Sequence, residues 1–237
     1  MGERVREMSD RLAAVADALT TAVPAAVARD VPAAELGTYR LGGPIGVLVR
    51  VADDDTLARV ADVLATHPLP LLVIGRGSNL LVADHGFAGV GIVLEGELER
   101  VEVAPDGSRV RAGGAVPLPV LARRTAAAGV TGLEFYVGIP GSVGGAVRMN
   151  AGGHGRETRD VLVAAPVRDL HHPERGRVTR TVHDLAFGYR ESALGPTEVV
   201  VDAEFASRPD TPEACGARID DVVRWRREHQ PGGQNAG

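Results

Sequence analysis

The sequence predicts an α+β fold, in which helices are interspersed among mostly short strands. Two patterns favour this class: some segments carry apolar residues at helical spacing, and others are short apolar runs bounded by turn residues. The length of 237 residues is enough for a sizeable core, in one large domain or two small ones. Hydrophobic residues make up 44% of the chain and charged residues 24%, which is ordinary for a globular protein.

Helical spacing is clearest at the start of the chain. Apolar residues there recur at steps of three and four positions and predict an amphipathic helix: Val5, Met8, Leu12, Val15 and Leu19. The Ala/Pro-rich segment from Pro24 to Ala34 is expected to be a connector, and the segment from Thr38 to Pro44 a turn. Asp53 can cap a helix whose apolar face is Leu57, Val60 and Leu64. The strands expected in this half are Val47 to Val51, Leu71 to Ile74 and Val90 to Leu94.

The second half of the chain shows the same mixture. The turn from Pro105 to Ser108 predicts a hairpin, and the segment from Pro117 to Ala128 predicts a helix capped by Gly129. Thr211, followed by Pro212, predicts a last helix. Its expected buried face is Ile219, Val222 and Val223. The strands expected in this half are Val101 to Val103, Arg109 to Arg111, Val161 to Val167, Val178 to Val182, and Glu198 to Phe205.

Composition excludes several functional classes. A net charge of -5 argues against a general nucleic-acid binder. No apolar run approaches the roughly 18 residues of a membrane span, and Glu3, Glu7 and Asp10 interrupt any signal-like region. The single cysteine, Cys215, cannot form an internal disulfide, and no Cys/His cluster has the spacing of a zinc site. We therefore expect a cytoplasmic protein, with neither a nucleic-acid nor a membrane partner and with no bound metal.

A glycine-rich stretch from Val137 to Gly155 stands out, because seven of its nineteen residues are glycine. Glycine costs backbone entropy, so this density needs a geometric reason: positive φ angles, or close approach of a ligand to the backbone. Ser142, Asn150 and His154 add polar groups among the glycines. This combination favours a ligand with a flat ring and anionic oxygens over the alternative, a ligand-free loop or barrel corner.

A second glycine-containing loop, Gly75 to Leu80, follows a predicted strand and can form an anion-binding nest for a pyrophosphate. It is not a Rossmann turn, because its spacing differs and the glycines at 86, 89 and 91 exclude a long following helix. A Walker P-loop is also absent. Ser78 and Ser142 are not nucleophile-elbow serines, because Arg76 and Pro140 occupy the position that requires glycine. The two glycine-rich loops together predict a dinucleotide between two subdomains.

Five ordered motifs make the chain from about Thr38 to Gly237 similar to the UDP-N-acetylenolpyruvoylglucosamine reductase family. They are Thr38-Tyr39-Arg40-Leu41-Gly42-Gly43, Gly75-Arg76-Gly77-Ser78-Asn79-Leu80-Leu81, Gly138-Ile139-Pro140-Gly141-Ser142-Val143-Gly144-Gly145, Asn150-Ala151-Gly152 and Tyr189-Arg190-Glu191-Ser192. The resemblance implies the FAD-binding fold of vanillyl-alcohol-oxidase (PCMH) type flavoproteins, with tightly bound FAD and NADPH as reductant. It also implies reduction of UDP-N-acetylglucosamine enolpyruvate to UDP-N-acetylmuramate, in peptidoglycan synthesis and hence in cell-wall biogenesis, cell shape and cell division.

The resemblance also implies roles for particular residues. The residues expected to contact FAD are Gly75, Arg76, Gly77, Ser78, Asn79, Leu80, Ile139, Pro140, Gly141, Ser142, Val143, Gly145, Asn150 and Gly152. Tyr189 and Arg190 are expected to bind substrate. Arg190 matches the catalytic arginine of the family, whose guanidinium would stabilise enolate charge beside the substrate carboxylate. The alternative for Arg190 is a surface ion pair with Glu191 or Glu198.

The chain departs from the family at its end. In the family, the Asn-Ala-Gly matched by Asn235 to Gly237 is followed by a proton-donating serine, and a glutamate lies further on. We therefore expect residues 1–37 to be an N-terminal helix and connector, residues 38–97 and 98–208 to be the FAD-binding subdomains, and residues 209–237 to begin an incomplete substrate domain. The 237-residue chain is expected to be a monomer and to be inactive alone. A non-catalytic FAD-binding remnant, or a different flavin oxidase on the same fold, is the alternative.

Overall fold

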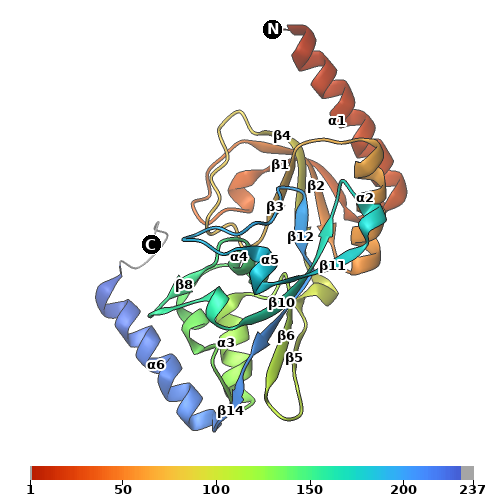
Figure 1. Cartoon of the computed structure of the whole chain (residues 1–237). Coiled ribbons are helices and arrows are strands. Elements are labelled where there is room, and N and C mark those ends of the chain that lie inside the picture. The colour runs from red at the N-terminus through yellow and green to blue at the C-terminus, as the bar shows by residue number, and fades with distance from the viewer. Residues whose placement is uncertain (1, 231–237) are drawn as a thin grey trace. The chain divides into compact units, whose positions relative to one another are not determined.

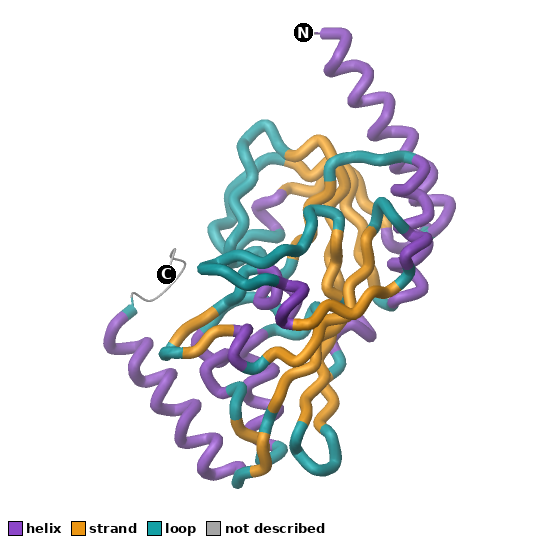
Figure 2. Tube along the Cα trace, viewed as in Figure 1, coloured by secondary structure: helices purple, strands orange, loops and turns teal. Residues whose placement is uncertain are grey.

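The computed structural model describes residues 2–230, which form two compact units (Figures 1 and 2). Unit 1 consists of the chain up to Glu97, together with Arg168–Arg177 and Gly195–Val199. Unit 2 takes the remaining segments. The expected Asn235 to Gly237 motif lies outside the described residues. None of the helices in the described part of the chain combines the length and apolar character that crossing a membrane requires.

Unit 1 is built on a four-stranded sheet of order β1-β2-β4-β3, in which β2, β4 and β3 are parallel and β1 is antiparallel to β2. Its strands are β1 (Val27–Pro32), β2 (Pro44–Val51), β3 (Leu71–Ile74) and β4 (Phe87–Leu94), and its helices are α1 (Gly2–Ala22) and α2 (Asp54–Thr66). The two helices pack against each other and on β2. The predicted cap is confirmed, because the Asp53 side chain accepts a hydrogen bond from the Thr56 amide at 2.6 Å.

The expectation that Pro24 to Ala34 is a connector is wrong, because this segment contains the strand β1. This strand pairs with β2 from Val27 opposite Val49 to Pro32 opposite Pro44. It lies at the edge of the sheet. Proline has no backbone N–H to donate, and an edge strand tolerates this on the side that faces no other strand. The Ala/Pro-rich composition suggested a linker, but the segment forms a strand.

The second part of the chain contains a six-stranded sheet of order β11-β10-β13-β6-β5, in which β12 also pairs with β10. Its strands are β5 (Val101–Val103), β6 (Arg109–Gly113), β10 (Leu162–Asp169), β11 (Arg177–Thr181), β12 (Glu198–Val200) and β13 (Asp202–Ala206). The predicted strand from Glu198 to Phe205 is therefore two strands, interrupted at Val201. The Val201 amide donates to the Pro166 carbonyl, and the Val201 carbonyl accepts from the Gly114 amide.

Further helices and short strands lie in unit 2. They are α3 (Leu118–Ala127), β7 (Val130–Thr131), the 3-10 helix η4 (Glu134–Gly138), α4 (Val143–Arg148), β8 (Gly152–Gly153), β9 (Arg156–Glu157), α5 (Val182–Leu185), β14 (Arg208–Pro209) and α6 (Pro212–His229). The last helix packs on α3 and η4. Its predicted cap is confirmed, since Thr211 accepts from the Ala214 amide at 3.2 Å. Ile219 is buried as predicted, whereas Val222 and Val223 are only half-buried.

Candidate functional site

The loop Gly75 to Leu80 directly follows β3 in unit 1. Gly77 has a φ of +63°, and a Cβ there would lie 1.9 Å from the Leu36 carbonyl oxygen. Only glycine fits this backbone. Gly75, Arg76 and Asn79 are exposed, whereas Gly77 is buried. The loop thus presents a guanidinium and an amide to solvent from a turn whose backbone has the left-handed geometry found in anion-binding nests.

The motif that starts at Thr38 lies against this loop. The Thr38 amide donates to the Gly77 carbonyl at 3.1 Å, and the Gly43 amide donates to the Ala83 carbonyl at 3.0 Å. A Cβ at Gly43 would lie 2.1 Å from the Asp84 carbonyl oxygen. The glycines of the first two motifs therefore allow two backbone segments of unit 1 to touch.

The central part of the glycine-rich stretch forms α4, which the sequence analysis did not predict. Ser142 caps this helix, since its side chain accepts from the Gly145 amide at 3.4 Å. The Val143 amide donates to the Val116 carbonyl and the Gly144 amide to the Gly114 carbonyl, both at 2.9 Å. The amides of Val143, Gly144 and Gly145 thus already have acceptors inside the protein.

The surface of this stretch is nevertheless open at Gly145. Pro140 and Gly145 are exposed, whereas Ser142 and Val143 are buried. A Cβ added to Gly145 would meet only the Ser142 hydroxyl, at 3.6 Å. A flat group can therefore approach the backbone at Gly145 without a steric barrier from the protein. Ile139 and Gly141 are half-buried beside it.

Arg190 lies on a tight turn of unit 2. The Gly188 amide donates to the Glu191 carbonyl at 3.2 Å, and Arg190 itself has a φ of +58°. Tyr189 is 82% exposed, and the Arg190 guanidinium carbon lies 5.2 Å from the centre of its ring. Such a cation–π contact restrains the arginine but leaves the guanidinium accessible.

The turn of Arg190 contacts the Asn150-Ala151-Gly152 motif. The Arg190 guanidinium donates to the Asn150 carbonyl at 3.5 Å and to the Gly152 carbonyl at 3.3 Å. The Ser192 hydroxyl donates to the Arg148 carbonyl at 2.8 Å. Within the described residues, Arg190 forms no ion pair with Glu191 or Glu198, so the alternative suggested by the sequence is not what the structure shows. Two motifs about forty residues apart in sequence therefore meet in one place.

A hollow of about 510 Å³ opens at this meeting point. Its lining contains the expected Gly152 and Arg190 together with residues that the sequence analysis missed: Gly153, Gly155, Arg156, Glu157, Arg159 and Asp160. Arg159 pairs with Glu157 at 2.9 Å. Arg156, Glu157, Arg159 and Asp160 directly follow the glycine-rich stretch, and their alternating charges were the signal available in the sequence.

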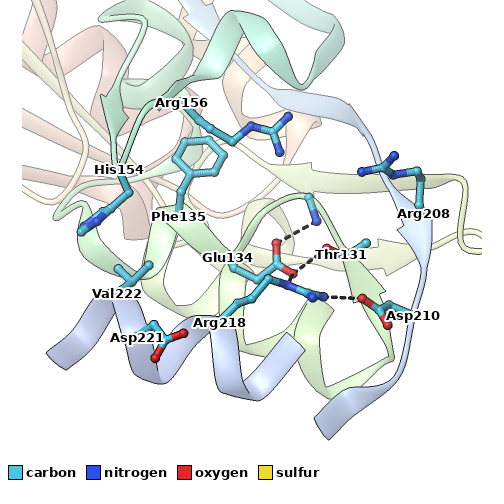
Figure 3. A pocket seen from close by; sticks show the side chains of 11 residues that line it. Thr131, Glu134, Phe135, His154, Arg156, Arg208, Asp210, Arg218, Asp221 and Val222 are labelled. Atoms are coloured by element: carbon cyan, nitrogen blue, oxygen red, sulfur yellow. Dashed lines mark hydrogen bonds and ion pairs between the residues drawn. The ribbon is translucent and has the colours of Figure 1, made fainter. Parts of the chain in front are cut away.

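A second hollow, of about 500 Å³, lies in unit 2 next to α6 (Figure 3). Glu134 is one of the residues that line it. Its carboxylate accepts hydrogen bonds from the Thr131 hydroxyl at 2.7 Å, the Gly132 amide at 2.8 Å and Arg218 Nε at 2.8 Å. Arg218 also bonds to Asp210. Burial alone would raise the pKa of Glu134, but the bonds from Thr131, Arg218 and Gly132 outweigh it, and the pKa is lowered. The carboxylate therefore stays charged and holds this part of the fold.

His154, in the glycine-rich stretch, lies against α6. Its ring is 5.0 Å from the Trp225 ring in an edge-on contact, and Trp225 stacks on His229 at 4.6 Å. Burial lowers the pKa of His154, and the charge of Arg226 lowers it further. A neutral His154 is therefore part of an aromatic cluster beside Trp225, which is 46% exposed.

Comparison with known proteins gives a consistent result. The family model described as "FAD binding domain" matches residues 45–169. The UDP-N-acetylenolpyruvoylglucosamine reductase of Caulobacter sp. (strain K31) is 45% identical over 195 residues, which are 81% of this chain and 62% of that protein. The enzyme of that name from Phenylobacterium zucineum is 41% identical over 212 residues, or 89% and 69%. The chain spans 62% and 63% of the two Caulobacter relatives that it matches.

Solved structures show the same relationship. The crystal structure of UDP-N-acetylenolpyruvylglucosamine reductase from Thermus caldophilus is 33% identical, with a TM-score of 0.75, and the match covers 88% of this chain and 72% of that one. Phl p 4.0202, a glucose dehydrogenase, is 12% identical with a TM-score of 0.61 over 90% of this chain and 49% of that one, a likeness of fold alone. The predicted α+β fold of the FAD-binding, PCMH type is confirmed. The chain belongs to the UDP-N-acetylenolpyruvoylglucosamine reductase family.

Proposed function

We propose that this chain supplies the FAD-binding part of an enzyme that reduces UDP-N-acetylglucosamine enolpyruvate to UDP-N-acetylmuramate with NADPH, in peptidoglycan synthesis. The observation that carries the proposal is the contact between the Arg190 turn and the Asn150-Ala151-Gly152 motif, in a member of this family. Two carbonyl groups use two of the five N–H donors of the guanidinium. The remaining donors can bind a carboxylate.

The residues expected to contact FAD fit such a group. The turn at Gly77, with Arg76 and Asn79 exposed beside it, suits a pyrophosphate. The open backbone at Gly145, next to Ile139 and Gly141, suits a flat ring, with Gly152 further along the same segment. The amides of α4 donate within the protein, so contact of α4 with a ring would be by van der Waals packing.

Bound FAD would supply the hydride-transfer chemistry, from NADPH to the enolpyruvyl double bond. The chain's contribution to that step is electrostatic. Negative charge develops on the enolate beside the substrate carboxylate, and the Arg190 guanidinium can bind both groups at once. Tyr189, exposed next to Arg190, is placed to contact the substrate and to limit the motion of the arginine.

Further properties of the protein belong to the same proposal. We propose that residues 209–237 begin the substrate domain, that the substrate is a UDP-sugar, and that the protein works as a cytoplasmic monomer. We also propose that the 237 residues alone give little or no product, because the family's proton-donating serine would follow Gly237. A chain that binds FAD without turnover in any longer form would instead favour a non-catalytic FAD-binding protein.

The proposal is tested in two stages. The 237-residue chain, purified and shown to be folded by circular dichroism, should bind FAD and show a flavin absorption spectrum. The protein encoded by the complete reading frame should then be reduced by NADPH and reoxidised by UDP-N-acetylglucosamine enolpyruvate in stopped-flow experiments. Absence of FAD binding would overturn the cofactor assignment. Reoxidation by oxygen but not by the enolpyruvyl compound would overturn the proposed substrate.

A further inference from the structure

The side chain of Asn150 lies at the centre of the contact that carries Arg190, and we propose that Asn150 is a positioning residue for this arginine. The inference rests on the proposed function, in which Arg190 binds the substrate. The family resemblance implies that Asn150 contacts FAD. The hydrogen bonds of its side chain point to a different role.

The Asn150 side chain has its hydrogen bonds made inside the protein. The residue is 0% exposed. Its Nδ2 donates to the Gly188 carbonyl and to Glu157 Oε2, each at 3.0 Å, and its Oδ1 accepts from the Arg159 amide at 3.1 Å. The opposite amide orientation would place oxygen against two oxygens and NH₂ against an N–H donor. The network therefore fixes the side chain and leaves no polar atom of it for a cofactor.

Asn150 forms two hydrogen bonds with the Arg190 turn. Its side chain holds the carbonyl of Gly188, the residue that closes the turn by donating to Glu191. Its own main-chain carbonyl accepts from the Arg190 guanidinium. Asn150 thus contacts both Gly188, where the turn begins, and the guanidinium of Arg190. Loss of the amide would free the turn and widen the range of guanidinium positions.

The backbone at Asn150 restricts what else can occupy this position. Its φ of +41° is left-handed, a region that asparagine visits more readily than most residues other than glycine. Aspartate would keep the shape but would face the Glu157 carboxylate and the Gly188 carbonyl with oxygen instead of a donor. Asparagine therefore satisfies both the backbone and the network.

The test uses the protein encoded by the complete reading frame, with Asn150→Ala and Asn150→Asp as separate variants. Each should slow reoxidation of the reduced flavin by the enolpyruvyl substrate by about tenfold or more, since a charged-group contact is weakened. Reduction by NADPH should change by less than about twofold. In an Arg190→Ala background, Asn150→Ala should add almost nothing to the loss, because positioning requires the arginine.

Thr158→Val provides the matched control. Thr158 is also 0% exposed and lies in the same segment, and its hydroxyl donates to the Ala151 carbonyl at 2.9 Å. It makes none of the hydrogen bonds that hold Gly188 or Arg190. Its removal should lower the melting temperature without a selective effect on reoxidation.

A second readout does not depend on turnover. Restricted rotation of the Arg190 guanidinium should give separate Nη signals in nitrogen-detected NMR, which Asn150→Asp should merge and Thr158→Val should leave intact. Equal losses in both half-reactions, full additivity with Arg190→Ala, or unchanged Nη signals in both Asn150 variants would overturn the positioning role. If the substrate does not reoxidise the wild-type flavin, the proposed function fails, while the NMR comparison still decides whether Asn150 orders Arg190.

Discussion

Arg218 Nε lies 2.8 Å from Glu134 Oε1, a contact that fastens the last helix to the start of η4 across 84 positions of sequence. Glu134 is only 8% exposed. The arginine is partly exposed and extends to Asp210 as well. The contact therefore joins the start of α6 to the rest of unit 2.

Removal of this arginine should destabilise the protein. We expect Arg218→Ala to lower the free energy of unfolding by about 1–2 kcal/mol, because Glu134 loses a charged donor while Thr131 and Gly132 remain. Arg224→Ala is the matched control, since Arg224 pairs with Asp221 on the exposed side of the same helix and should change stability by less than about 0.5 kcal/mol. Urea denaturation of both variants measures the difference, and equal effects would contradict the assignment.

Glu134 should also contribute to acid denaturation. Its folded-state pKa is lowered, whereas a glutamate in an unfolded chain titrates near about 4.3. The folded protein therefore binds fewer protons at this group, and the stabilisation is present above that pH and lost as the pH falls through the folded-state pKa. We expect Glu134→Gln to be less stable at pH 7 and to lose less stability between neutral and acidic pH. Thermal melts across that range test this, and parallel curves for both proteins would be inconsistent with it.

The fluorescence of Trp225 can report on the protonation of His154, whose ring lies against it. It is the single tryptophan of the chain, so intrinsic indole fluorescence reports on this site. An imidazolium quenches indole more strongly than imidazole does, and the pKa of His154 is lowered by burial and by Arg226. The fluorescence change that His154→Gln removes should therefore have its midpoint below about pH 6.5, the ordinary pKa of histidine. His85→Gln, an exposed change in unit 1, should leave the titration unaltered.

Two glycines with similar φ angles separate steric conflict from backbone strain. Gly77 has a φ of +63° and no room for a Cβ, whereas Gly155 has a φ of +76° and nothing within 4 Å. Gly155→Ala should cost about 1 kcal/mol of stability from strain alone. Gly77→Ala should cost clearly more and should also weaken FAD binding, because the loop must move away from Leu36. Calorimetry and FAD titration of the pair make the comparison, and equal costs would refute the steric explanation.

Arg190→Lys tests the substrate contact in the protein encoded by the complete reading frame. Lysine keeps the charge but loses the planar, bidentate geometry. Loss of about 3–4 kcal/mol of transition-state stabilisation would slow reoxidation by the substrate by roughly a hundred- to a thousandfold, with a much smaller effect on reduction by NADPH. Stopped-flow measurement of both half-reactions, with a thermal melt, distinguishes this from a general loss of stability. An unaltered reoxidation rate would remove Arg190 from the site.

The sequence predicted those elements whose signals are local. Asp53 and Thr211 were recognised as caps because a cap needs only the residue and the amides that follow it. Helix α4 was missed because its glycines disfavour helix, and it depends on the cap at Ser142 and on the distant carbonyls of Gly114 and Val116.

The missed parts of the site have the same cause. The network of Asn150 unites residues from three separate places in the chain, and no spacing rule in the sequence relates Gly188 to Glu157. The Glu134–Arg218 contact is equally remote in sequence. The order of the motifs identified the segments of the site, but the hydrogen bonds between these segments could be seen only in the folded structure.

The interleaving of the two units has a consequence for how such a gene can change. Unit 1 takes Arg168–Arg177 and Gly195–Val199 from within the sequence that otherwise builds unit 2. A single recombination event between residues 97 and 98 would therefore bring together pieces of two parents inside unit 1 itself. Neither unit can therefore be exchanged or expressed as one uninterrupted segment of the chain.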